Sequence, residues 1–190
     1  MIAIDIPIGL TDKGPRRCDQ EGRRLLGFPR RSSVFPAPIR SALVAETRVR
    51  AAKINFNADG RKVGVQSFGI FAKIREIDEV LRPNPKMQSR VFEVHPELSF
   101  WAWNGGKAMA HSKKSLLGKV ERRCLVDRCF GQAAVDIVRA SHPAKEVGLD
   151  DIHDAFAALW TAQRIFEEIA QVVPNPPPLD TEGLMMTIWY

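Results

Sequence analysis

A nearly unbroken apolar run opens the chain and constrains its fold more than any other segment. Residues 2–10 read IAIDIPIGL, are rich in β-branched side chains, and end at Pro7 and Gly9. This pattern predicts a strand over residues 2–8 that is buried on both faces. Strands of that kind occur in parallel sheets, so the predicted fold class is α/β.

Asp5 is the one charged residue in this run. A buried carboxylate costs several kcal/mol unless it is paired or binds a cation. It would lie near the carboxyl end of the strand, which is the edge of an open α/β sheet where ligands bind. Asp5 is therefore expected to pair with a buried arginine, to cap a helix, or to hold a metal ion.

The length and composition predict one domain over residues 1–190. The chain has 190 residues, of which 45% are apolar, enough for a single core. A second strand is expected over residues 91–95, a loop over 55–64, and a helix over 65–81. Another long helix is expected from residue 149, with an apolar face made of Ile152, Ala155, Phe156, Leu159, Trp160, Gln163 and Phe166.

Acidic residues recur at the ends of these elements. They are Asp5 after the first strand, Glu93 and Glu97 around the second, and Asp150, Asp151 and Asp154 at the start of the long helix. Carboxylates from separate elements are the ligands that Mg²⁺ and similar ions prefer, and Asp151 and Asp154 share a helix face. The predicted metal ligands for Mg²⁺ or Mn²⁺ are Asp5, Glu93, Asp151 and Asp154. Asp150 or Asp151 has an alternative role as a helix cap.

Two further residues complete the predicted catalytic set. His95 titrates near neutrality in its unperturbed state and is a candidate general acid or base; alternatively, it binds the backbone. Lys113, next to Lys114, would neutralise a phosphate, or the two lysines form a solvated pair.

Charge and cysteine content indicate the setting of the protein. The net charge is +6 and the pI is near 9.5, which favours a polyanionic partner such as nucleic acid. The three cysteines lack metal-ligand spacing and are expected to be reduced thiols in the cytoplasm. No apolar run reaches the roughly 20 residues of a membrane span, so no membrane partner is expected.

Eight segments in order along the chain resemble one known family. They are IDIPIGL, RRCDQEGRRLLG, SSVFPAPIR, KIREIDEVL, FEVHPELSF, SKKSLLGKVERR, DDIHDAFAALWTA and DTEGLMMTIWY. The chain is similar over nearly its whole length to domain-of-unknown-function family 429, a group of predicted nucleases with a ribonuclease H-like fold. The resemblance implies that Asp5 ends a central strand, that Glu93 lies on the next one, and that Asp151 and Asp154 start the final helix beside them.

The resemblance also implies an incomplete sheet. Members of this family are similar to ribonuclease H in opening with a three-stranded meander that carries an aspartate in a GxD-type motif, and this chain has no counterpart of it. We therefore expect a truncated mixed or parallel sheet flanked by helices, whose natural start lies upstream or which needs a partner.

Two functions follow from these features. The first is a divalent-metal-dependent nuclease-like protein that acts on phosphodiester bonds of nucleic acid, with little or no hydrolysis by this 190-residue chain. The second is a non-catalytic remnant of a ribonuclease H-like fold that binds nucleic acid or protein. Oligomeric state is open.

Overall fold

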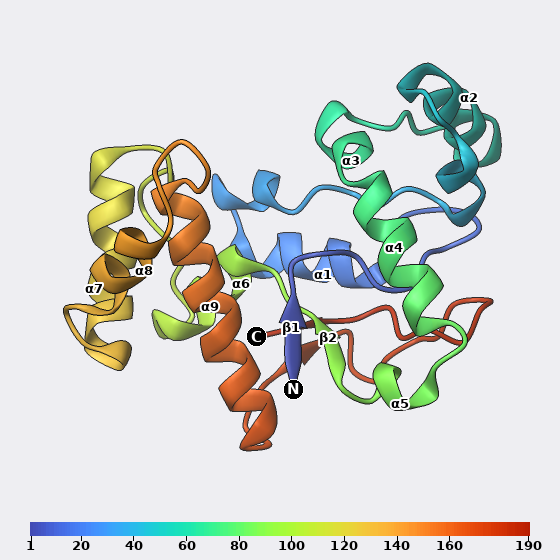
Figure 1. The fold of residues 1–190 in the computed structure, drawn as a ribbon. Coiled ribbons are helices and arrows are strands. Elements are labelled where there is room, and N and C mark those ends of the chain that lie inside the picture. The colour runs from blue at the N-terminus through green and yellow to red at the C-terminus, as the bar shows by residue number, and fades with distance from the viewer.

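The computed structural model describes residues 1–190 and is a helix-rich α/β fold around two small sheets (Figure 1). β1 (Ile2–Ile4) pairs in parallel with β2 (Val91–Glu93), and β3 (Val172–Val173) pairs antiparallel with β4 (Ile188–Trp189). A parallel bridge between Val94 and β4 joins the two sheets. The expected α/β class is therefore confirmed.

Helices make up most of the regular secondary structure. In chain order they are α1 (Arg17–Leu26), the short 3-10 turns η1 (Arg30–Ser33) and η2 (Arg40–Val44), α2 (Arg48–Asp59), α3 (Val65–Gly69), α4 (Phe71–Leu81), α5 (Pro85–Gln88), α6 (Pro96–Trp103), α7 (Leu116–Phe130), α8 (Ala134–Ser141) and α9 (Leu149–Phe166).

The helices form two lobes on either side of the strands (Figure 1). One lobe contains α7, α8 and α9, the other contains α2, α3 and α4, and α1 and α6 lie between them. α9 packs against α6, α7, α8 and β1, so its first turns come close to the carboxyl end of β1. This arrangement leaves a space between the lobes directly beyond the strands.

β1 is shorter and less buried than the sequence predicted. It ends at Ile4 instead of continuing to Ile8, and Ile2 is 43% exposed. The predicted burial on both faces is wrong, since none of the three residues of β1 is fully buried, and the strand has β2 as its only neighbour in the sheet. Residues 5–9 leave the sheet and turn toward the start of α1.

Two predicted boundaries between helix and loop also differ. Residues 55–64 were expected to form a loop, but α2 runs through Asp59. Asn55 is buried, and its side-chain oxygen accepts a 3.0 Å hydrogen bond from the Ile39 amide. Its polar side chain therefore does not indicate a solvent-exposed loop. The helix predicted over residues 65–81 is divided at Ile70 into α3 and α4.

The buried face of α9 is only partly the one that its large apolar residues predicted, since Ile152 is buried and Phe156 packs against the core. Leu159 and Phe166 are exposed, whereas His153, Ala157 and Thr161 are buried. Small side chains on this face let α6 approach closely, and the Thr161 hydroxyl donates a 2.8 Å hydrogen bond to Ser99 of α6. The face that carries Asp154 is thereby held against α6.

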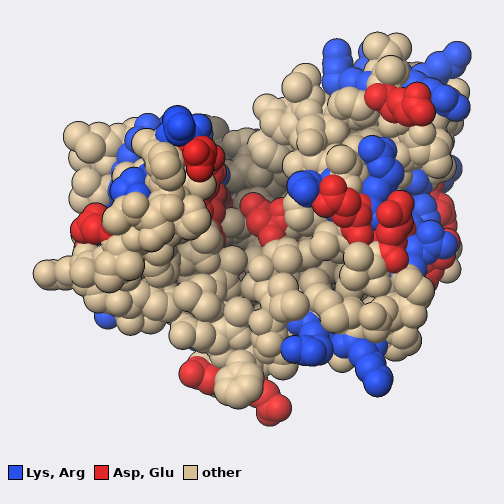
Figure 2. All heavy atoms as spheres, viewed as in Figure 1, with Lys and Arg blue, Asp and Glu red and all other residues tan.

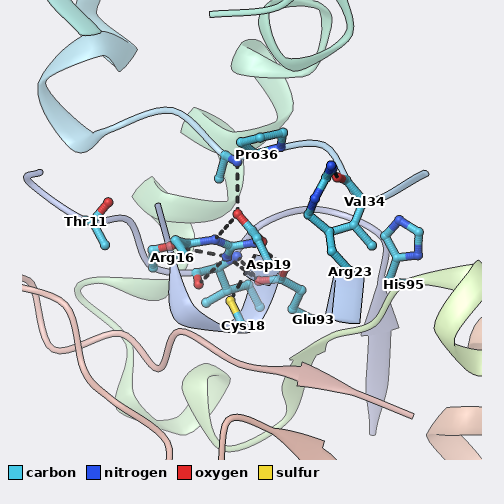
Figure 3. A network of polar contacts seen from close by, with 12 residues as sticks. Thr11, Arg16, Cys18, Asp19, Arg23, Val34, Pro36, Glu93 and His95 are labelled. Carbon is cyan, nitrogen blue, oxygen red and sulfur yellow. Dashed lines mark hydrogen bonds and ion pairs between the residues drawn. The ribbon is translucent and has the colours of Figure 1, made fainter. Parts of the chain in front are cut away.

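Arg16 lies at the centre of a buried cluster of charges (Figure 3). Its Nη1 and Nη2 atoms each lie 2.7 Å from a different carboxylate oxygen of Glu93, and Nη2 also pairs with Asp19. Nη1 donates to the carbonyls of Ile8 and Gly9, and Glu93 accepts a hydrogen bond from the Ile8 amide. One guanidinium thus connects the segment after β1, the start of α1 and the end of β2.

Replacing Arg16 by methionine should destabilise the fold strongly. The change leaves the carboxylates of Glu93 and Asp19 buried without their cation, which costs about 3–5 kcal/mol of unfolding free energy. Urea denaturation of Arg16→Met and Arg17→Met would measure it. Arg17 is exposed and pairs only with Glu21, so its substitution should cost less than about 1 kcal/mol. Equal losses in the two variants would show that the buried cluster does not hold these elements together.

Candidate functional site

A cavity of about 650 Å³ lies beyond the carboxyl ends of β1 and β2. Figure 2 shows a hollow between the two lobes, with acidic side chains at its edge. Its polar and charged lining residues come from seven separate segments: Asp5, Arg16, Asp19, Arg30, Ser32, Ser33, Gln66, Glu93, His95, Glu97, Ser112, Lys113, Lys114 and Asp154. The position agrees with the edge of an α/β sheet at which ligands usually bind.

Asp5 faces this cavity immediately after β1. Its side chain is open to solvent on the cavity side and makes no ion pair. Dehydration by the surrounding cavity walls raises the pKa of Asp5, while the nearby His95 and Lys113 oppose the rise. The prediction that Asp5 pairs with a buried arginine does not describe it, since Arg16 pairs with Glu93 and Asp19 instead.

Asp154 lies opposite in the second turn of α9. Its Oδ2 atom is 2.6 Å from Nζ of Lys113, whereas its Oδ1 atom is buried and has no hydrogen-bond partner. Burial raises the pKa of Asp154 to about 6, and the negative charges of Asp5 and Glu97 add to the rise, although Lys113 opposes it. These three acids are thus electrostatically coupled through Asp154.

Glu97 is a site residue that the predicted set of metal ligands did not contain. It lies in the first turn of α6 and pairs through one oxygen with the fully buried Arg122, while its Oε2 atom is buried without a partner. The acidic segment EVHPE was the available signal, because Pro96 starts α6 and turns the next carboxylate toward α9.

Glu93 and Asp151 have other roles in the structure. Glu93 lines the cavity, but both of its oxygens bind Arg16, and burial raises its pKa to about 7 despite that pairing. Asp151 does not line the cavity; its carboxylate accepts a 2.9 Å hydrogen bond from the Gly148 amide and caps α9. The structure therefore separates these two residues from Asp5 and Asp154.

His95 and Lys113 both reach the cavity. The Nε2 atom of His95 lies 3.2 Å from the carbonyl oxygen of Ser33, and its Nδ1 atom is buried without a partner. Lys113 is not a solvated side chain, because its ammonium group binds Asp154 and lies 3.9 Å from Asp150. Lys114 pairs with Asp150 at 2.6 Å.

The carboxylates of this cavity do not form a complete metal-binding site by themselves. No three Asp, Glu, His or Cys side chains lie close enough together to hold an ion as they stand. Mg²⁺, however, is commonly held by one or two carboxylates together with substrate phosphates. Asp5 and Asp154 line the same cavity, and the Oδ1 atom of Asp154 has no partner, so these two carboxylates are the candidate ligands for an ion of this kind.

The cysteines and the apolar segments can also be compared with the structure. All three cysteines are free; Cys18 is buried, and Cys124 and Cys129 are exposed on α7. None of the helices combines the length and the apolar character that crossing a membrane requires.

Fold and cavity together define an α/β protein with acidic and basic side chains gathered at the carboxyl end of a parallel strand pair. The family model described as "Protein of unknown function (DUF429)" matches residues 1–179. The chain belongs to this family, as the eight segments indicated. No curated protein and no solved structure matches the chain.

The pairing of Lys113 with Asp154 predicts a measurable titration. In metal-free buffer the carboxyl ¹³C signal of Asp154 should titrate near pH 6, and Lys113→Met should move its pKa upward because the opposing cation is lost. Since the folded carboxyl keeps its proton above its ordinary value of 3.8, the contribution of Asp154 to stability, measured against Asp154→Asn, should fall as the pH rises from about 4 to about 6.

Lys114→Met is the matched control for this titration, because Lys114 binds Asp150 and not Asp154. An Asp154 signal that titrates near 3.8 in the unmodified protein, or that responds equally to both lysine variants, would contradict the assignment.

Proposed function

We propose that the cavity is a nuclease-type site on a ribonuclease H-like fold, which binds phosphodiester groups of nucleic acid together with Mg²⁺ or Mn²⁺. Hydrolysis of these groups goes beyond the little or no cleavage that the sequence predicts for this chain, and the last experiment below tests it. The observation that carries the proposal is the buried, unpartnered Oδ1 atom of Asp154, which lies among acids at the end of a parallel strand pair. A buried carboxylate oxygen without a partner is costly, and a cation offers the missing interaction.

Basic side chains on the cavity wall suit a phosphate ligand. Arg30, Lys113 and Lys114 all line the cavity, and both lysines are now paired with acids of α9. A cation bound at Asp5 and Asp154 would compete with Lys113 for Asp154. The released ammonium group could then pair with a phosphate oxygen, so that cation and phosphate favour each other's binding.

The remaining side chains have distinct parts in the proposed reaction. A divalent cation held at Asp5 and Asp154 would supply Lewis-acid stabilisation and an activated water. Asp5 and Asp154 hold that cation, and Lys113 neutralises charge on the phosphate. His95 lines the cavity and is the candidate that transfers a proton to the leaving oxygen. Glu93 acts indirectly, because its pairing with Arg16 positions the segment that carries Asp5.

Cation binding should depend on Asp5 and Asp154. We expect Mn²⁺, and more weakly Mg²⁺, to raise the melting temperature, since an ion at about 100 times its Kd adds about 2.7 kcal/mol to stability. Asp5→Asn and Asp154→Asn should remove this rise. Asp151→Asn is the matched control, because it lies outside the cavity and its amide oxygen can still accept the Gly148 hydrogen bond.

Cleavage of end-labelled DNA and RNA oligonucleotides by the same variants tests the reaction. Metal-dependent cleavage that both cavity variants lose by about 100-fold or more, and that Asp151→Asn retains, supports the nuclease. Oligonucleotide binding that the cavity variants weaken, without cleavage in Mg²⁺ or Mn²⁺, would replace it by the non-catalytic binding function. No response to either cation would overturn the proposed site.

A further inference from the structure

Phe35 is an exposed aromatic residue on a firmly anchored segment. Its side chain is 47% exposed, although buried Val34 precedes it and buried Ala37 follows two residues later. The anchors are hydrogen bonds from His95 to the Ser33 carbonyl, from Arg23 to the Val34 carbonyl at 2.7 Å, from Ser67 to the Pro36 carbonyl at 3.0 Å, and from the Ala37 amide to Asp19 at 3.0 Å.

Figure 3 shows two of these anchors around Val34 and Pro36, the neighbours of Phe35. Arg23 and Asp19 both come from α1, and Asp19 is itself bound to Arg16. The backbone on either side of Phe35 is therefore fixed by the buried carboxylate of Asp19 and the half-buried guanidinium of Arg23. Exposure alone does not distinguish Phe35, since Phe28 and Phe166 are more exposed. Its distinguishing feature is that this anchored residue lines the cavity that holds Asp5 and Asp154.

A second cavity of about 420 Å³ adjoins the first at this residue. Phe35 and Gln66 line both cavities. The second cavity is otherwise formed by residues of the segments 36–38 and 61–67 together with Asn55, and it includes the basic side chains of Arg61 and Lys62. Its volume falls within the range of about 300–1,000 Å³ that is typical of small-molecule sites.

We propose that the second cavity is a subsite for one unpaired nucleobase, which stacks on Phe35 while the adjoining phosphate occupies the first cavity. This inference rests on the proposed function, since it places the phosphate beside Asp5 and Asp154. A base offers a flat π-face to the phenylalanine ring, and Gln66 and Lys62 at the rim can hydrogen-bond with its edge or with the next phosphate.

A subsite for one unpaired base favours single-stranded over double-stranded nucleic acid. A base inside a duplex is stacked and paired, so it can enter a cavity only after it has been extruded from the helix. A single strand presents unstacked bases without that cost, and aromatic stacking of this kind tolerates any base. The protein should therefore bind single strands more tightly than duplexes of the same sequence, without strong sequence preference.

Fluorescence anisotropy with a labelled single-stranded 12-mer, in Ca²⁺ to suppress cleavage, tests this subsite directly. Phe35→Ala and Phe35→Leu should weaken binding by about tenfold, since stacking on an aromatic side chain contributes about that factor or more per base. Phe35→Trp should retain or strengthen binding, because it keeps a π-face. Phe28→Ala is the matched control, since Phe28 is 86% exposed and lines neither cavity.

A 12-mer of abasic sugar phosphates separates base stacking from phosphate binding. It should bind weakly, and Phe35→Ala should leave its affinity unchanged. Equal affinity for single strand and duplex, or equal effects of Phe35→Ala and Phe28→Ala, would overturn the nucleobase subsite. Strand binding that depends on Phe35 without cleavage in Mg²⁺ or Mn²⁺ would contradict only the proposed hydrolysis. Cleavage that is unaffected by Phe35→Ala would contradict only the subsite.

Discussion

The buried guanidinium of Arg16 is the interaction on which both cavities depend. Through Glu93 and the carbonyls of Ile8 and Gly9 it holds the segment that leaves β1 after Asp5. Through Asp19, which also binds the Ala37 amide, it holds the segment that carries Phe35. A planar group with several fixed donors can satisfy both carboxylates at once, which a lysine ammonium could not do with the same geometry.

The two lysines on the wall of the first cavity are paired with acids of α9. Asp154 and Asp150 are neutralised by Lys113 and Lys114, whereas Asp5 has no ion pair. Under the proposed function, acids of this wall would bind the cation and its lysines would bind the phosphate. In the structure these lysines bind acids of α9 instead. Binding of both ligands would exchange internal ion pairs for external ones, so the net electrostatic cost of opening the pairs is reduced.

Many of the charged residues that line the first cavity could be predicted from the sequence, because they lie at the ends of predicted strands and helices. Asp5, His95, Lys113 and Asp154 all reach the cavity, as does Glu93. The sequence did not separate Glu93, whose oxygens serve Arg16, from Glu97, whose Oε2 atom has no partner. That distinction depends on which arginine lies beside each acid, and those arginines come from segments far away in the chain.

By itself, the sequence determined the family, the α/β class and the acids that flank β1, β2 and α9, because local pattern and segment order carry this information. Only the tertiary structure decided which acids remain free, which face of α9 is buried, and that Phe35 stands between two cavities. These properties arise from contacts between distant segments, and a side chain's polarity does not reveal whether its partner is solvent, backbone or an opposite charge.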